Sequence, residues 1–351
     1  MEKNNEIKRH LLEHQQHTQL NSAELADLFN NYLGDSLFVC MFEHFLQIVE
    51  DEEIRDYVEF ALGLSNKHIK EITAIFNREN IPVPVGFGEQ DIRKDAPRLF
   101  SDAFMVFYIV QMSSTSIITY GNALSTSSRQ DIMHYFRDSL NDSAETYERG
   151  KHLMLLKGID ASYPNIPYAK KVDFAEKKSF ISLITGRDRP LAANEIKHLQ
   201  YNIFTNILGK SLMLGFSQVA SSEKIRKYFR NGAELSGKQI NDFSQHLTSQ
   251  DLPAPELMDE HITDSTTSPF SDKLMMYHGS LAGNIALTNI GTALSQMFRH
   301  DLATELMKLI PIIAKYNNDG INLMIEHGWF EEPFTAADRE RLSKSPNGGL
   351  T

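Results

Sequence analysis

Apolar residues recur at intervals of three and four along most of the chain, which is the spacing of one face of an α-helix. The first such run begins at Ser22, which we expect to cap the helix, and continues through Leu25, Leu28 and Phe29 to about Val49. Strand signals are nearly absent, so the pattern predicts an all-α protein. The other predicted helices cover 51–76, 100–125 and 131–157, and then lie near 193–220, 223–250, 270–298 and 301–327.

The second set of helices repeats the first. A shift of 171 residues places Glu24, Leu28 and Asn31 on Glu195, Leu199 and Asn202. One deletion later the shift becomes 170, and Phe100-Ser-Asp102 then falls on Phe270-Ser-Asp272. A single slip in so long a match indicates an internal duplication.

The connections between helices are unequal, and this predicts the topology. The first and second helices of each repeat are joined tightly, as are the third and fourth. The second and third are separated by long loops, from Ile81 to Leu99 and from Leu252 to Pro269. An extended loop of that length can run along a whole helix. The pattern therefore predicts two tandem ferritin-like four-helix bundles, each with one long crossover.

We divide the chain into an N-terminal extension (1–20), a first bundle (21–158), a linker (159–190), a second bundle (191–334) and a tail (335–351). In the extension His10, His14 and His17 share one helical face, which we interpret as solvated. We expect an ordered linker, since Phe174, Phe180 and Ile184 are apolar anchors.

Composition narrows the class of protein. The 351 residues are 41% hydrophobic and 23% charged, as in a soluble globular protein, with a net charge of −11. Such a charge argues against general binding to nucleic acid or to an anionic membrane. The only cysteine, Cys40, lies among apolar residues and is expected to be a buried thiol in a reducing cytoplasm. We find neither a signal peptide nor an apolar run long enough for a membrane span.

Several acidic and histidine residues have the spacing of metal ligands. Glu195 and His198 stand at i, i+3, as do His68 and Glu71, and Glu24 with Asp27 is the counterpart of the first pair. In di-metal bundles this spacing turns both side chains inward, so iron or manganese is the implied ion. Glu24 and His68, however, are expected to lie about 15 Å apart along the bundle. They cannot share one ion in that geometry.

Polar residues are expected at the level of His68 in both bundles. In the first bundle they are Asn30, Asn31, Asp35, Thr119, Tyr120, Asp142 and Glu145, and in the second they are Asn202, Asn206, Gln239, Asn289 and Asn317. We favour buried polar networks over a redox metal site. A mononuclear site that joins His68 with Glu145 or Asp142 is the alternative. His278, the counterpart of Tyr108, is expected to be a hydrogen-bonded core histidine.

The segment 270–298 is rich in small residues, including Gly279, Ala282, Gly283 and Ala286. Small residues let helices pack closely, and they could also form one wall of a cavity. No nucleotide-binding loop, nucleophile motif or cysteine pair occurs along the chain.

Four stretches resemble one bacterial family: Thr266-Thr-Ser-Pro-Phe-Ser-Asp-Lys-Leu-Met-Met276, Leu212-Met-Leu-Gly-Phe-Ser-Gln-Val-Ala220, Asp251-Leu-Pro-Ala-Pro255 and Ala96-Pro-Arg-Leu-Phe-Ser-Asp102. This is domain-of-unknown-function family 3231, found mainly in spore-forming Gram-positive bacteria, and the resemblance covers about residues 20–335. It implies a ferritin-like fold, and some members are labelled spore-coat-like. Gln239 departs from the histidine expected there in relatives.

Three functions are consistent with these observations. The first is a non-enzymatic structural or interaction protein with an unidentified protein partner, associated with sporulation or stress. The second is an oxidoreductase-type bundle that binds iron or manganese through groups such as Glu24, Asp27, His68, Glu71, Glu145, Glu195 and His198. The third is a carrier of a small apolar ligand, with a pocket beside Gly279 and Gly283. A homodimer is a further expectation, on the general frequency of such dimers.

Overall fold

The computed structural model describes residues 18–159, 162–175, 178–181 and 189–344. The histidines at 10, 14 and 17 and Ile184 lie outside the described residues. Within the described ranges the chain is helical, and its β pairing is confined to isolated bridges. The long helices are α2 (Ser22–Ile48), α3 (Glu52–Arg78), α4 (Asp102–Thr126) and α5 (Gln130–Leu156), followed by α6 (Ala193–Val219), α7 (Glu223–Thr248), α8 (Asp272–Gln296) and α9 (His300–Glu326).

The observed helix ends differ from the predicted ones by at most two residues. The capping residues explain the shifts. Asn21, rather than Ser22, accepts hydrogen bonds from the first turn of α2, and the Glu24 carboxylate returns a bond to the backbone N–H of Asn21. Ser101 and Ser271 cap α4 and α8 in the same place in each repeat. Local polar side chains thus set the helix starts.

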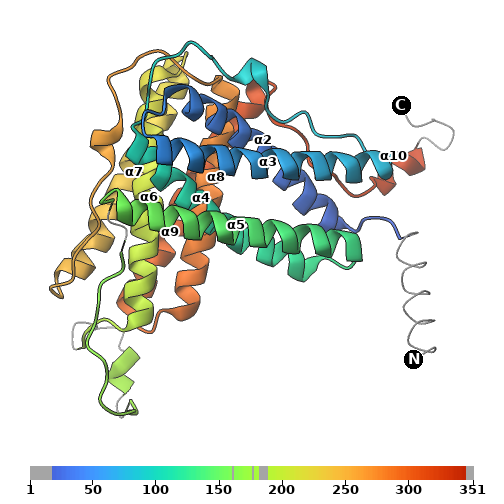
Figure 1. Ribbon diagram of the computed structural model, residues 1–351. Helices are drawn as coiled ribbons and strands as arrows, with labels where there is room; N and C mark the ends of the chain where they lie inside the picture. Colours follow the sequence, from blue (N-terminus) through green and yellow to red (C-terminus); the bar gives the residue numbers. More distant parts are fainter. Residues whose placement is uncertain (1–17, 160–161, 176–177, 182–188, 345–351) are drawn as a thin grey trace, which may run out of the picture.

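Each repeat, α2–α5 or α6–α9, contains two antiparallel pairs of helices joined by a crossover loop. The start of α4 lies beside the turn between α2 and α3, because the Asp102 carboxylate accepts the backbone N–H groups of Glu50 and Asp51. Lys157 at the end of α5 pairs with Asp51 there. The long loop therefore carries the chain back along the repeat, as predicted. In Figure 1 the helices of the first repeat run across the view and those of the second run up and down.

The two crossover loops pair with each other and join the repeats. Antiparallel bridges link Ile92 to Phe270 and Phe100 to Ile262. The shift of 170 residues converts one bridge into the other, so the loops are related by a pseudo-two-fold axis. Two 3-10 turns in the loops, η1 (Glu89–Asp91) and η4 (Asp259–His261), occupy equivalent places. The duplicated halves are therefore arranged as the two subunits of a symmetric dimer would be.

A hydrogen bond crosses the interface close to this axis. The hydroxyl of Tyr108 in α4 lies 2.8 Å from Nε2 of His278 in α8, and these two residues are counterparts in the repeat. Both are completely enclosed by protein. One hydrophobic core runs through both repeats around this pair, and a second, smaller core closes the far end of the first repeat.

Helix α4 lies at the centre of this packing. Among the described helices, α4 is the one that is long and apolar enough to cross a membrane. We did not expect an apolar run of this length from the sequence. However, 61% of its most apolar window is buried inside the protein. Its hydrophobicity is explained by contacts with both repeats.

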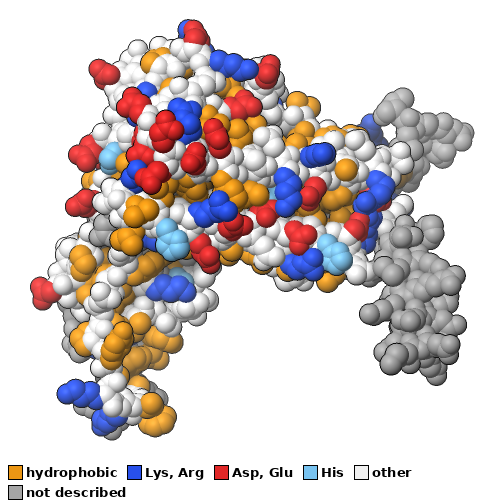
Figure 2. Space-filling view, viewed as in Figure 1, with side chains coloured by type: hydrophobic (Ala, Val, Ile, Leu, Met, Phe, Trp, Pro, Cys, Tyr) orange, Lys and Arg blue, Asp and Glu red, His pale blue; other side chains and the backbone are white. Residues whose placement is uncertain are grey.

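The linker differs from the prediction in one respect. Phe174 is 85% exposed, so our expectation that it anchors the linker is wrong. Phe180 in η2 (Lys178–Ile181) does make contacts, because its ring lies under the guanidinium of Arg189 and beside Phe298. Figure 2 shows hydrophobic side chains along the arm that this linker forms. Tyr168 and Val172 contribute to that exposed apolar surface.

Two glycines in the first repeat should respond oppositely to alanine. A Cβ at Gly150 would overlap the Tyr57 hydroxyl and Val110, whereas a Cβ at Gly63 would meet nothing. We expect Gly150→Ala to destabilise the fold by about 1–3 kcal/mol through overpacking. Gly63→Ala should stabilise it by about 0.5–1 kcal/mol, because the helix then loses less backbone entropy. Chemical denaturation of both variants would check this, and equal effects would contradict the packing described here.

Candidate functional site

The most concentrated group of polar residues in the core surrounds His68 of α3. Its Nδ1 lies 3.3 Å from the Asp35 carboxylate of α2, and its Nε2 lies 3.2 Å from the Asp142 carboxylate of α5. Lys67 donates to the same Asp142 oxygen at 2.7 Å. One imidazole thus joins three helices of the first repeat.

Two tyrosines and an amide complete this cluster. The Asn31 amide donates to the Asp35 carboxylate and, at 2.9 Å, to the hydroxyl of Tyr120. The Tyr135 hydroxyl donates to the Asn31 carbonyl oxygen at 2.6 Å. The rings of Tyr120 and Tyr135 both meet the His68 ring edge to face. We call Asn31, Asp35, His68, Tyr120, Tyr135 and Asp142 the His68 cluster.

The cluster holds His68 as a cation. Burial opposes protonation of the imidazole, but the charges of Asp35 and Asp142 and the hydrogen bond with Asp142 outweigh it and raise the pKa of His68 to about 9. Burial also acts to raise the pKa of Asp142, yet hydrogen bonds from His68 and Lys67 hold that pKa below its usual value. The cluster is therefore a buried ion pair, with the two carboxylates on opposite edges of one ring.

The orientation of the His68 ring is unfavourable for metal binding. A metal ligand must offer a free lone pair, and a set of ligands must point at one place. Here the two nitrogens of His68 face different carboxylates in opposite directions. Within the described part of the chain no group of three or more His, Cys, Asp or Glu residues is arranged to hold a metal ion.

Two of the predicted ligands cap helices. Glu24 accepts hydrogen bonds from the backbone N–H groups of Asn21, Ser128 and Arg129 at 2.8–2.9 Å. Its counterpart Glu195 does the same at the equivalent turn of the second repeat and also binds the guanidinium of Arg189. Both carboxylates are buried at the end of their repeat. In this position they hold the start of α2 or α6 against the turn before α5 or α9.

The remaining predicted ligands are dispersed. Asp27 accepts a hydrogen bond from Thr126, and burial raises its pKa. Glu71 is half-buried, and Glu145 is exposed and paired with Arg149 on the outer face of α5. His198 is buried, and desolvation lowers its pKa. The structure thus brings His68 together with Asp35 and Asp142 but with none of the other proposed ligands.

The second repeat carries amides at the level of the His68 cluster. Asn206 and Gln239 occupy the positions of Asp35 and His68, and Asn202, Asn289 and Asn317 are buried nearby. Their bonds are mostly local: Asn202, Asn206 and Gln239 each donate to the carbonyl four residues earlier in the same helix. The amides are therefore a buried layer, as predicted, but they form little of the interhelical network that we expected.

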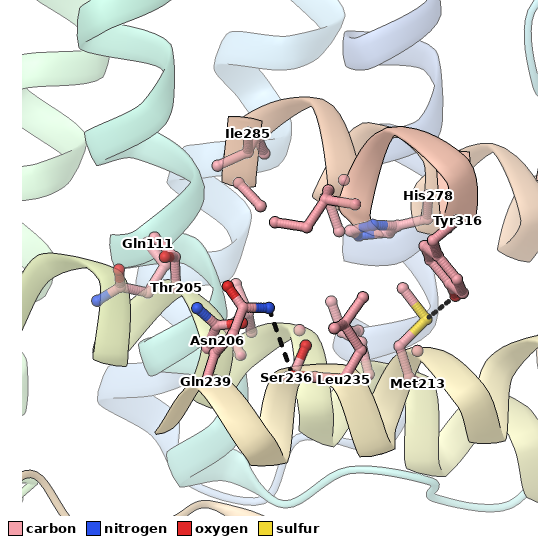
Figure 3. A pocket seen from close by; sticks show the side chains of 18 of the residues that line it. Gln111, Thr205, Asn206, Met213, Leu235, Ser236, Gln239, His278, Ile285 and Tyr316 are labelled. Atoms are coloured by element: carbon pink, nitrogen blue, oxygen red, sulfur yellow. Dashed lines mark hydrogen bonds between the residues drawn. The ribbon is translucent and has the colours of Figure 1, made fainter. Parts of the chain in front are cut away.

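A small cavity lies beside this amide layer (Figure 3). It is lined by Gly209, Gly232, Gly283 and Ala286, and its volume is about 50 Å³, on the scale of a few water molecules. Gln239 is 2% exposed, and its amide oxygen has no hydrogen-bond partner within the described residues. Next to Gly279 the rings of Tyr228 and Phe229 fill the space. The pocket expected beside Gly279 and Gly283 is thus confined to the side of Gly283.

Two further buried histidines and the buried thiol are neutral. Burial lowers the pKa of His278 to about 4, and the Tyr108 hydroxyl pairs with its Nε2. Burial likewise lowers the pKa of His44 to about 4. The Cys40 thiol is buried, as predicted, and desolvation raises its pKa to about 12. These groups behave as parts of the core.

Sequence reasoning did not identify Tyr135, a member of the His68 cluster, or Lys67, which lies beside it. Tyr135 stands seven residues before Asp142, so a helical wheel places both on the inner face of α5. Lys67 was missed because its sequence neighbourhood is that of an exposed helical face. In the structure its long side chain reaches across to the Asp142 carboxylate.

Comparison with known proteins adds a family. The sequence matches the family described as "Protein of unknown function (DUF3231)" twice, over residues 10–172 and 179–342. No curated protein matches the chain. Among solved structures, the crystal structure of a "putative spore coat protein" from Bacillus halodurans C-125 is similar over 45% of this chain and 99% of its own length, with 16% identity and a TM-score of 0.39.

Proposed function

Since the chain belongs to the DUF3231 family of proteins of unknown function, we propose that it acts as a non-enzymatic structural or interaction protein. In this proposal each repeat is a ferritin-like four-helix bundle that serves as a rigid structural unit. The tight helix pairs and the long crossover support the bundle topology. A cytoplasmic setting with spore association completes the proposal, on the expectations from the single cysteine and the family resemblance.

One observation carries this proposal: three of the inward-facing candidate ligands, Glu24, His68 and Glu195, are engaged with the protein itself. His68 is held between two carboxylates, and Glu24 and Glu195 accept backbone N–H groups at helix starts. A catalytic acid, base or metal ligand needs a free position facing a substrate or an ion. Here such positions are occupied by neighbouring side chains and backbone. The acidic and histidine side chains that could serve an oxidoreductase instead hold the helices together.

Metal content tests the proposal. We expect protein purified without chelator from cells supplied with iron and manganese to contain far less than one ion per chain. Elemental analysis by plasma mass spectrometry measures this, with His68→Gln as the matched variant because Gln239 occupies the counterpart position. A near-stoichiometric metal that His68→Gln removes would overturn the proposal. Metal retained equally in both proteins, and bound elsewhere, would also overturn it.

A further inference from the structure

A second, larger cavity lies between the two repeats. It is lined by α2 of the first repeat, by α8 and α9 of the second, and by the segment 329–333 that follows α9, and its volume is about 220 Å³. It is open to solvent beside exposed lining residues such as Phe330 and Pro333. Its walls are mainly aromatic and aliphatic. They include Phe29, Leu33, Phe87, Tyr277, Leu281 and Trp329. We call this cavity the interrepeat pocket.

The segment that closes the pocket is fixed in place. The Glu331 carboxylate accepts the backbone N–H groups of Val85 and Gly86, at 2.8 and 2.7 Å, from the first crossover loop. The ring of Phe334 then packs against Phe29 and Phe76. Polar contacts on one side and ring contacts on the other therefore hold 329–333 over the pocket. The pocket is built into the fold and does not depend on a free end of the chain.

The equivalent place in the other half of the molecule is filled by a tyrosine. Gly158 and Gly328 end α5 and α9 in the same left-handed conformation, with φ of 70° and 69°. Five residues after Gly158, the ring of Tyr163 packs against Phe204 at 5.9 Å between ring centroids. Five residues after Gly328 the chain has Pro333 instead.

Two residues of the wall are smaller than their counterparts, whereas Phe29 and Trp329 are larger than theirs, Gln200 and Ile159. Leu33 stands where the other half has Phe204, and Asn30 stands where it has Tyr201. Tyr201 and Phe204 fill their side, because Tyr201 reaches Ser114 at 3.4 Å and Phe204 meets Phe107. The interrepeat pocket thus lies at the position where the ring of Tyr163 packs against Phe204 in the other half.

The groups at the pocket favour a neutral ligand. Lys273 donates to the Gly86 carbonyl oxygen at 2.7 Å and lies over the Phe87 ring, and Glu331 is engaged as described. Ser280 is buried in the wall, and its Oγ lies beside the Tyr228 hydroxyl in the core of the second repeat.

We propose that the interrepeat pocket binds a small neutral molecule with a single aromatic ring. The ring takes the place that Tyr163 takes in the other half. The size agrees, since a cavity of about 150 Å³ holds benzene. This inference is separate from the proposed function, because metal content and ligand binding are measured independently.

The test uses 4-methylphenol, which is the side chain of tyrosine as a free molecule. Trp329 lines the pocket and is the only tryptophan in the chain, so its fluorescence reports occupancy. We expect a saturable change in emission, and a matching calorimetric titration, with a Kd of roughly tens to hundreds of micromolar for a ligand of this size. Toluene, which has the same ring without the hydroxyl, should also bind.

Variants identify the site. Pro333→Tyr and Leu33→Phe each restore a residue that fills the other half, and each should abolish binding. Leu155→Phe is the matched control on an exposed position and should leave binding unchanged. Because Leu33→Phe alters the core, Pro333→Tyr in the surface segment gives the independent result. Absence of saturation, or binding that survives both filling variants, would overturn the proposal.

Discussion

Replacing Glu195 with alanine is expected to lower the free energy of unfolding by about 3–5 kcal/mol, the cost of removing one partner of a buried ion pair. Glu195 is 0% exposed and binds Arg189 through both oxygens, at 2.8 and 2.9 Å. It also accepts the backbone N–H groups of Ala192 and Arg299. The substitution leaves a guanidinium and two buried N–H groups without their acceptor. Urea denaturation followed by circular dichroism measures the loss.

Glu223→Ala is the matched control for this prediction. Glu223 begins α7, is exposed, and pairs with Arg226 and Arg230 at the surface, where ion pairs contribute little. Its removal should change the free energy of unfolding far less than Glu195→Ala does. If Glu195→Ala were as mild as Glu223→Ala, the capping role assigned to Glu195 would be incorrect.

The same capping role shows where sequence reasoning about the site reached its limit. The i, i+3 spacing of Glu195 and His198 is real, and it does place both side chains on the buried face of α6. Spacing within one helix does not reveal which groups approach from other helices. The turn before α9 brings a backbone N–H to Glu195, so its carboxylate ends as a cap. By contrast, comparing positions along the bundle axis correctly separated Glu24 from His68, because the rise per residue of an α-helix is nearly constant.

The fold was more predictable than the site. Heptad-like apolar spacing and the internal repeat predict all eight long helices, because both are properties of the local chain. The resemblance to family 3231 is confirmed by the match over both repeats. The pairing of the two crossover loops could not be predicted. Bridges such as Ile92 with Phe270 join residues far apart in sequence, and the prolines in each loop interrupt any strand pattern.

Duplication explains why the two halves differ inside. In a symmetric dimer each polar substitution would appear twice, but in a fused chain each half can change alone. The first repeat retains the charged pair of Asp35 and His68, and the second has the neutral pair of Asn206 and Gln239. The charged pair stabilises the fold only while His68 is protonated, whereas the amides do not titrate. Stability of the two halves should therefore depend differently on pH.

Wild-type protein is expected to lose stability as pH rises from about 6.5 to above 9, and His68→Gln should lack this component. The pKa of His68 is raised to about 9 in the folded state, against about 6.5 in the unfolded chain. A raised pKa contributes stability that is fully present below the unfolded value and is lost as pH passes the folded one. The difference corresponds to roughly 3 kcal/mol. Denaturation midpoints of both proteins across this pH range measure it.

A double variant separates the charge of the cluster from its packing. His68→Gln alone leaves Asp35 buried opposite a neutral amide, so it should be destabilised near neutral pH. Adding Asp35→Asn installs the pair that the second repeat holds at Asn206 and Gln239, and it should recover a large part of the loss. Lys67 continues to neutralise Asp142 in both variants. Parallel pH profiles for wild type and His68→Gln would refute the buried ion pair, because only a titrating His68 makes the two curves converge at high pH.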